Sequence, residues 1–406
     1  MSARVALIGA GVTSRVVAIS LARDDLATWV GELLIADKDP EAAKRAAEES
    51  QALTRSKQVS WTQLDARDVD AVARLVRGYD ILINGAIFKV IPPLTKAALE
   101  ARVPYIDFGS DRETLQWQLS LSEDFRRVGV PALPAMGGSP GLINVLARLA
   151  VDQLDEVREI RMREGWIDRV DYEALGIPLP VPYSFETILD EFVYGGEVWT
   201  AEGPRPTPPL GGREEFEFPE PVGRQPCYYV DHPETWSLGE TFRDRGLQLV
   251  DYKLSFPDDL LEKYDLLVRL GFASEDPLDL PGCGRSPMEI LEYLVNRTIQ
   301  GKSWTPDDVD VMVVTAVGSI SVRPATVVVT ASAESWTRPP ASAHGILVAA
   351  PAITAARMLV EGELKPGVHL PERAIDPEPF LREVARFGVS VDLTVTTKRL
   401  SLQREE

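Results

Sequence analysis

The first residues of the chain contain the feature that most constrains its fold. Val5–Ile8 is a short apolar run typical of a buried strand, and it leads directly into the sequence GAGVTS at residues 9–14. Gly9 permits a tight turn, and Gly11 has no side chain, so an anion can approach the backbone there. A helix that begins near Val12 would point free N–H groups and a partial positive charge at that anion. Strand, glycine turn and helix in this order predict a dinucleotide-binding unit, although Ser14 stands where the pattern has a third glycine or alanine.

A second apolar run ends in an acidic residue, as this kind of unit requires. Asp37 follows residues 33–36 and lies 23 residues after Ser14. A carboxylate at this point accepts hydrogen bonds from the ribose hydroxyls of NAD and repels the 2′-phosphate of NADP. Lys38 beside it leaves room for NADP. We therefore expect NAD as the cofactor, with NADP as the alternative. Asp65 follows the third strand, where it serves either the adenine edge or a turn.

Strand and helix patterns alternate throughout the first third of the chain. The expected strands are 5–8, 32–36, 59–63, 80–84, 105–108 and a short one near 131–134. Such repeats predict an α/β fold: a Rossmann-like, doubly wound parallel sheet with helices on both faces. Ligands bind at the carboxyl ends of these strands, which adds the residues after the fourth strand to the site. The expected cofactor-binding residues are Gly9, Gly11, Val12, Thr13, Ser14, Asp37, Lys38, Asp65, Asn84, Gly85 and Ala86.

The pattern changes after about residue 140. Longer alternating strands, among them 156–163, 247–256, 311–317 and 320–331, predict a second α+β domain with a mixed or antiparallel sheet. The Pro- and Gly-rich stretch 203–226 is typical of an ordered excursion or a flexible loop. The apolar segment 345–359 resembles a helix of the first domain. We therefore expect a dinucleotide-binding domain from 1–138 and 344–376, and a substrate and dimerisation domain from 139–343 and 377–406.

Composition excludes several classes of function. The 62 acidic and 43 basic residues give a formal charge of −19, which argues against a nucleic-acid partner. Two cysteines and three histidines predict neither a disulfide framework nor a metal centre. The N-terminus has no signal-peptide pattern, and the apolar run 345–360 is shorter than the ~20 residues of a membrane span. We expect a cytoplasmic protein with no membrane partner.

Several segments, in order along most of the chain, resemble the saccharopine dehydrogenase-like family. They are VALIGAGVTS, LLIADKD, DILINGAI, VPYIDFGSD, PAMGGSPGLINVLA, VPYSFETILDEF, LQLVDYKLSF and HGILVAAPAITAARMLVEGELKPGVHLPE. The resemblance implies an NAD(P)-dependent oxidoreductase that acts on a C–N bond of a small amino acid or amine, and a homodimer or homotetramer. Oxidative deamination of lysine at its terminal amine, as in the lysine 6-dehydrogenase branch, is the reaction we expect. Reductive condensation of an aldehyde or keto acid with an amine, of the saccharopine or carboxynorspermidine type, and a non-catalytic nucleotide sensor are the alternatives.

Four residues are candidates for chemistry on such a substrate. Asp107 ends the fifth strand and would face the cleft beside the nicotinamide as a general base; the alternative is a helix cap. Lys253 lies in an alternating strand and would bind a substrate carboxylate or act as an acid–base group; the alternative is a solvated strand face. Tyr183 and Thr235 would hold the substrate by hydrogen bonds, or else be a packed aromatic ring and a turn residue.

Overall fold

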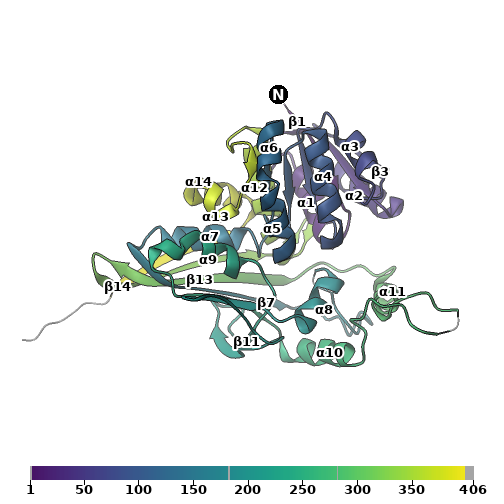
Figure 1. Cartoon of the computed structure of the whole chain (residues 1–406). Helices are drawn as coiled ribbons and strands as arrows, with labels where there is room; N and C mark the ends of the chain where they lie inside the picture. The colour runs from purple at the N-terminus through teal and green to yellow at the C-terminus, as the bar shows by residue number, and fades with distance from the viewer. Residues whose placement is uncertain (1, 182, 281, 398–406) are drawn as a thin grey trace, which may run out of the picture.

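The computed structural model describes residues 2–181, 183–280 and 282–397. It has two parts, a helix-covered parallel sheet and, beneath it in Figure 1, a long mixed sheet. The parallel sheet has seven strands in the order β17-β6-β5-β4-β1-β2-β3. Their bounds are Ala3–Ile8 (β1), Val30–Asp37 (β2), Gln58–Gln63 (β3), Ile81–Asn84 (β4), Tyr105–Asp107 (β5), Pro131–Leu133 (β6) and Gly367–Val368 (β17). The strand order reverses between β1 and β4, and this is the point where α/β sheets bind their ligands.

Helices cover both faces of the parallel sheet, which confirms the predicted fold class. They are α1 (Val12–Ala22), α2 (Pro40–Gln51), α3 (Val69–Val76), α4 (Ile91–Ala101), α5 (Arg112–Ser120), α6 (Ser122–Val128) and α12 (Ala343–Val360). Local signals set their starts: Asp39 caps α2 by accepting a hydrogen bond from the Glu41 N–H, and Pro40 fills the first helical position. Helix α12 is long and apolar enough to cross a membrane, but it is mostly buried and packs on α1, as a core helix does.

The second sheet has nine strands, with the main order β10-β11-β12-β7-β13-β14-β18 and with β8 and β9 attached beside β12. Their bounds are Glu156–Asp168 (β7), Glu197–Thr200 (β8), Gly203–Pro206 (β9), Glu214–Glu217 (β10), Arg224–Tyr229 (β11), Leu249–Ser255 (β12), Asp308–Ile320 (β13), Arg323–Glu334 (β14) and Ser390–Thr397 (β18). β12 runs parallel to β7 while the other pairs are antiparallel, so the sheet is mixed, as expected. The stretch 203–226 contains β9 and β10, so the ordered excursion is the one of the two predicted alternatives that the structure shows.

The two faces of the mixed sheet have different environments. Alternation along β7 places Met162 and Glu164 on one face and Arg161 and Arg163 on the other. The first face is covered by α7 (Leu142–Val151), α9 (Glu234–Phe242) and α12, and so faces the parallel sheet. The remaining helices are α8 (Phe185–Val193), α10 (Asp258–Arg269), α11 (Pro287–Ile299), α13 (Pro371–Ala374) and α14 (Pro377–Val384). The exact domain boundaries stay a prediction.

Candidate active site

The glycine turn after β1 is shaped for a ligand at the start of α1. Gly9 has φ +108°, and a Cβ built on it would lie 2.8 Å from the Ala86 nitrogen and from the Gly85 oxygen, so only glycine fits. Gly11 caps α1, and a Cβ there would meet no heavy atom of a described residue within 4 Å. The backbone at the start of α1 is therefore open to the approach of a phosphate. These features fit the predicted dinucleotide.

Ser14 has a structural role that a third glycine would not provide. Its hydroxyl donates a 2.5 Å hydrogen bond to the Gly85 carbonyl, and Ser14 itself is buried. The Asn84 side chain accepts a hydrogen bond from the Ala86 N–H at 2.9 Å and donates one to the Tyr105 hydroxyl at 3.0 Å. The glycine turn and the loop after β4 are thereby fixed to each other. Val12 and Thr13 form the first turn of α1, where Val12 is exposed.

Asp37 lies at the end of β2 and contacts the glycine turn directly. One carboxylate oxygen accepts a hydrogen bond from the Ala10 N–H at 2.8 Å, and the other accepts one from the Asp39 N–H at 2.9 Å. Lys38 beside it is exposed. Asp65 is exposed and pairs with Arg67 at 2.7 Å; hydrogen bonds from Arg67 lower the pKa of Asp65 to about 2. This contact is the one expected of a turn carboxylate.

Asp107 is buried at the end of β5, but its side chain points into the neighbouring loops. One oxygen accepts hydrogen bonds from the backbone N–H groups of Gly109 and Ala135, both at 3.0 Å. The other oxygen accepts a hydrogen bond from the Gln118 amide at 2.6 Å. These donors all belong to the parallel-sheet part. The structure therefore places Asp107 where it can position the β5 and β6 loops, and its predicted role as a base stays a prediction.

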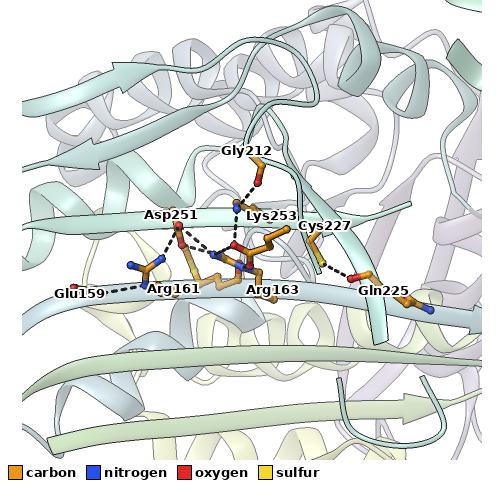
Figure 2. Close-up of polar contacts among 10 residues, drawn as sticks. Glu159, Arg161, Arg163, Gly212, Gln225, Cys227, Asp251 and Lys253 are labelled. Atoms are coloured by element: carbon orange, nitrogen blue, oxygen red, sulfur yellow. Dashed lines mark hydrogen bonds and ion pairs between the residues drawn. The ribbon is translucent and has the colours of Figure 1, made fainter. Parts of the chain in front are cut away.

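Lys253 is buried and bonded to protein groups, on the sheet face opposite to Glu164, so it is not on the solvated strand face that was the alternative; its predicted role with a substrate stays a prediction. Figure 2 shows it in an ion-pair network. Because Lys253 pairs with Arg163 in the sheet, strand alternation places this network on the face opposite to Glu164. Its ammonium donates hydrogen bonds to Glu214 at 2.6 Å and to the Gly212 carbonyl at 2.5 Å. Arg163 pairs with Asp251 at 2.7 Å and also with Glu214. Because strand residues alternate between faces, it is the neighbouring Tyr252 that points toward the cofactor side.

That cofactor-side face carries a group of ionisable residues from separate elements, here called the acidic cluster. It consists of Glu164 (β7), Tyr183 (before α8), Glu191 (α8), His232 (before α9), Glu234 (α9), Tyr252 (β12), Asp310 (β13) and His344 (α12). All four carboxylates are buried, while Tyr183 and His344 are partly exposed. Burial of several like charges is unfavourable unless protons or a cation compensate for them. The cluster is therefore suited to bind a cation or to exchange protons.

Glu164 lies at the centre of the acidic cluster. Its Oε2 accepts hydrogen bonds from the Tyr252 hydroxyl at 2.9 Å and from the Ser139 hydroxyl at 2.5 Å. Glu164, Asp310 and His344 each offer one ligand atom, and these atoms lie within 4.8 Å of one another. Burial, with the adjacent Asp310 charge, raises the pKa of Glu164 to about 7. A carboxyl group with this pKa can both take and give a proton near neutral pH.

Two stacked aromatic pairs hold the rest of the acidic cluster. The Tyr183 ring stacks on His344 with centroids 5.0 Å apart, and its hydroxyl donates a hydrogen bond to Glu191 at 2.7 Å. Burial raises the pKa of Glu191 to about 7. These contacts make Tyr183 a member of the acidic cluster, and its role in holding the substrate stays a prediction.

The second pair is formed by His232 and Tyr252, whose rings stack with centroids 4.7 Å apart. Burial opposes protonation of His232, but Glu234, 3.2 Å away, outweighs it and raises the pKa of His232 to about 9. Thr235 is also buried, and its hydroxyl donates a hydrogen bond to the His232 carbonyl at 3.3 Å. Thr235 thus makes the contact expected of a turn residue.

A short path of contacts connects the acidic cluster with the glycine turn. Ser139 follows β6 on the segment that leaves the parallel sheet. A Cβ built on Gly137 would lie 3.4 Å from Phe108 Cβ, and one built on Gly85 would lie 3.3 Å from Phe108 Cε2, so the Phe108 side chain contacts both glycines. Lys89, after β4, pairs with Glu275 at 2.8 Å and with Glu186 of α8. These contacts link the dinucleotide turn with the acidic cluster across the two sheets.

A dinucleotide turn joined in this way to buried proton-exchanging groups defines a two-domain NAD(P)-dependent oxidoreductase. The family model "Saccharopine dehydrogenase NADP binding domain" matches residues 5–133, and "Saccharopine dehydrogenase C-terminal domain" matches residues 137–389. The chain belongs to the saccharopine dehydrogenase family, which confirms the resemblance in its sequence. The members of this class are oxidoreductases that act on CH–NH groups.

Individual relatives agree with this placement. The chain is 24% identical over 417 residues to the carboxynorspermidine synthase of Vibrio cholerae, and this alignment covers 95% of each of the two chains. The chain is also 24% identical over 304 residues to the carboxyaminopropylagmatine dehydrogenase of a Synechocystis species, and this alignment covers 72% of each of the two chains. The saccharopine dehydrogenase (L-Glu forming) of Saccharomyces cerevisiae has the same fold, with a TM-score of 0.73 and 14% identity over 97% of this chain and 100% of that one.

Proposed function

We propose that this protein joins an aldehyde to a diamine or polyamine by NAD(P)H-dependent reductive condensation, or runs that reaction in reverse. The charge of the acidic cluster carries the proposal. With all four buried carboxylates ionised, two negative charges remain even when both imidazoles are protonated. Without a bound cation, Glu164 and Glu191, whose pKa values are raised to about 7, compensate by taking up protons. A diamine at neutral pH carries two positive charges and would neutralise the two negative charges. The acidic cluster therefore favours a cationic substrate.

The composition of the acidic cluster also bears on the choice among condensing reactions. Its eight residues include neither arginine nor lysine, the side chains that normally hold a substrate carboxylate. Formation of saccharopine would place more carboxylates beside the acidic cluster than condensation of one amino-acid semialdehyde with a diamine, and this environment disfavours each added negative charge. The names of the relatives in Vibrio and Synechocystis, which refer to carboxynorspermidine and carboxyaminopropylagmatine, support an amine-rich substrate.

In such a reaction, residues of the parallel-sheet part would bind the cofactor, and residues of the acidic cluster would bind the amine. Gly9, Gly11 and the start of α1 would hold the pyrophosphate, and Asp37 would hold the ribose. The bound NAD(P)H supplies the hydride that reduces the C=N bond. The acidic cluster would bind the amine, exchange its protons and exclude water from the carbon that receives the hydride.

The test is an absorbance assay of NADH or NADPH oxidation with an amino-acid semialdehyde and a panel of amines. We expect turnover with 1,3-diaminopropane, putrescine or agmatine, and a secondary-amine product by mass spectrometry. Propylamine is the matched control, because it has the same reacting group but one charge fewer. Equal turnover with propylamine, or no condensation with any diamine, would contradict the proposal.

Three further predictions from the sequence concern lysine as a substrate, the oligomeric state and the location in the cell, and each has its own experiment. Oxidative deamination of lysine stays a prediction, and lysine with NAD or NADP is therefore one arm of the assay. A homodimer or homotetramer is also a proposal; β18 is an edge strand on which Leu393 and Val395 are exposed. Light scattering of the purified protein tests it. Residence in the cytoplasm stays a prediction that fractionation of the source cells would check.

A further inference from the structure

We propose that Glu164 exchanges the proton of the reacting amine, and that Asp310 binds this amine beside it with His344 as a positioning residue. The inference rests on the proposed function and assigns the step to particular atoms. Glu164 and Asp310 lie on the neighbouring antiparallel strands β7 and β13, where Glu164 pairs with Met312 and Asp310 with Trp166. Both side chains point to the cofactor side of the sheet.

Asp310 has an oxygen that needs a donor. Asp310 is 2% exposed, and its Oδ1 is buried without a hydrogen-bond partner among the described residues. A buried acceptor left unpaired is unfavourable, so a donor from a bound ligand would stabilise the site. The other oxygen, Oδ2, lies 3.4 Å from His344 Nδ1, which fixes the orientation of the carboxylate. An ammonium group has the donors and the charge that Oδ1 lacks.

Glu164 has one oxygen held and one free. Tyr252 and Ser139 both donate to Oε2, whereas Oε1 makes no hydrogen bond to a described residue. The ligand atoms of Glu164, Asp310 and His344 lie within 4.8 Å of one another, so a nitrogen bound by Asp310 is within reach of Glu164. The ionisable groups around Glu164 are Asp310 on β13, His344 on α12, Tyr252 on β12, and the more distant Glu191, Tyr183, His232 and Glu234.

One carboxylate can serve both proton transfers of the condensation. Ionised Glu164 takes a proton from R–NH₃⁺, and the free amine adds to R′–CHO to give the carbinolamine R–NH–CH(OH)–R′. Protonated Glu164 then gives this proton to the hydroxyl, which leaves as water while the C=N⁺ bond forms. A hydride from NAD(P)H reduces that bond to R–NH–CH₂–R′. Glu164 ends as it began, and the sum is R–NH₃⁺ + R′–CHO + NAD(P)H → R–NH–CH₂–R′ + H₂O + NAD(P)⁺.

The experiment compares Glu164→Gln with wild type and with the matched variant Glu372→Gln. Glu372 is also fully buried with a pKa raised by burial, but it lies on α13, outside the acidic cluster, and bonds Asn144 and Thr241. We expect Glu164→Gln to lower kcat at least ~100-fold, in the range of lost acid–base catalysis, with unchanged NADPH affinity. The acidic limb of the pH profile of kcat/KM should disappear in Glu164→Gln and persist in Glu372→Gln.

Asp310→Asn supplies the second readout. It should raise KM for the diamine about tenfold and leave KM for the aldehyde unchanged, because it removes one charge-assisted contact to the ammonium. A Glu164→Gln enzyme with kcat within threefold of wild type, or with an intact acidic limb, would overturn the inference alone. Failure of wild type with every amine, while NADPH still binds, would overturn the proposed function first. A stoichiometric metal ion in the purified enzyme, lost in Asp310→Asn, would also overturn the inference, because the three side chains would then be metal ligands.

Discussion

The Tyr252 hydroxyl donates a 2.9 Å hydrogen bond to Glu164 Oε2 across two parallel strands of the mixed sheet. Ser139, on the segment that leaves the parallel sheet, donates to the same oxygen at 2.5 Å. One carboxylate oxygen is thus held from both parts of the molecule, and the other is left for a ligand. The predictions below follow from this arrangement and from the elements that support it.

The Tyr252→Phe variant should move the acidic limb of kcat/KM to higher pH. The hydroxyl stabilises the ionised form of Glu164, so its removal raises the pKa of Glu164 above about 7. A hydrogen bond to a carboxylate contributes about 1.5–3 kcal/mol, which corresponds to a shift of about 1–2 pH units. The pH profile of condensation measures the shift. Tyr229→Phe, on the opposite face of the sheet, is the control, and a limb unchanged in Tyr252→Phe would contradict the prediction.

Substitution of the two glycines of the dinucleotide turn should affect different properties: Gly9→Ala should lower the stability of the fold, and Gly11→Ala should weaken cofactor binding. Gly9→Ala should destabilise the fold by about 1–3 kcal/mol, because its φ of +108° and a 2.8 Å approach to Ala86 exclude a Cβ. Gly11→Ala should change the unfolding free energy by less than ~1 kcal/mol, since its Cβ would enter open space. Gly11→Ala should nevertheless weaken NADPH binding about tenfold. Denaturant unfolding and fluorescence titration measure the two effects, and wild-type affinity in Gly11→Ala would refute the phosphate site.

Asp37 should set the preference for NAD over NADP. The Asp37→Asn variant removes the charge that repels a 2′-phosphate, so the ratio of kcat/KM for NADPH to that for NADH should rise about tenfold. Glu41→Gln is the matched control, because it removes one exposed charge from the first turn of α2 and leaves the glycine turn untouched. A wild type that already prefers NADPH, with no change in Asp37→Asn, would show that Asp37 only supports the turn through Ala10.

The ion-pair network of Figure 2 should contribute to stability and not to catalysis. Arg163→Met would leave the Asp251 carboxylate, whose side chain is 2% exposed, with Arg161 at 3.6 Å as its one remaining ion-pair partner among the described residues. Removal of one partner of a buried pair costs about 3–5 kcal/mol, which urea unfolding would measure. Arg158→Met, an exposed change on the same strand, should cost less than ~0.5 kcal/mol. An Arg163→Met protein as stable as wild type, or with reduced activity per folded molecule, would contradict this assignment.

The comparison of sequence and structure is most informative at β7. The alternating pattern predicts a strand that ends at Arg163, but the strand continues to Asp168, so Glu164 lies one residue beyond the predicted end. Asp310 likewise precedes the predicted start of its strand at residue 311. An acidic side chain in phase with the apolar positions Ile160 and Met162 was the available signal, because an inward carboxylate in a strand is rarely structural. Lys253 is out of phase with Tyr252, and alternation alone does not reveal which of the two faces the cofactor.

The sequence by itself determined the dinucleotide-binding fold, the glycine turn, Asp37 at the end of β2 and the returning helix α12, because each depends on residues within one strand–turn–helix unit. Backbone preferences, caps and apolar periodicity act over this range. Only the tertiary structure decided which side chains meet at the acidic cluster. Glu164, Tyr252, Asp310 and His344 come from four elements that span residues 164 to 344 of the chain, and sheet register together with helix docking brings them into contact. A one-residue change of register would turn these strand residues to the opposite face, so the site depends on long-range packing that no local pattern specifies.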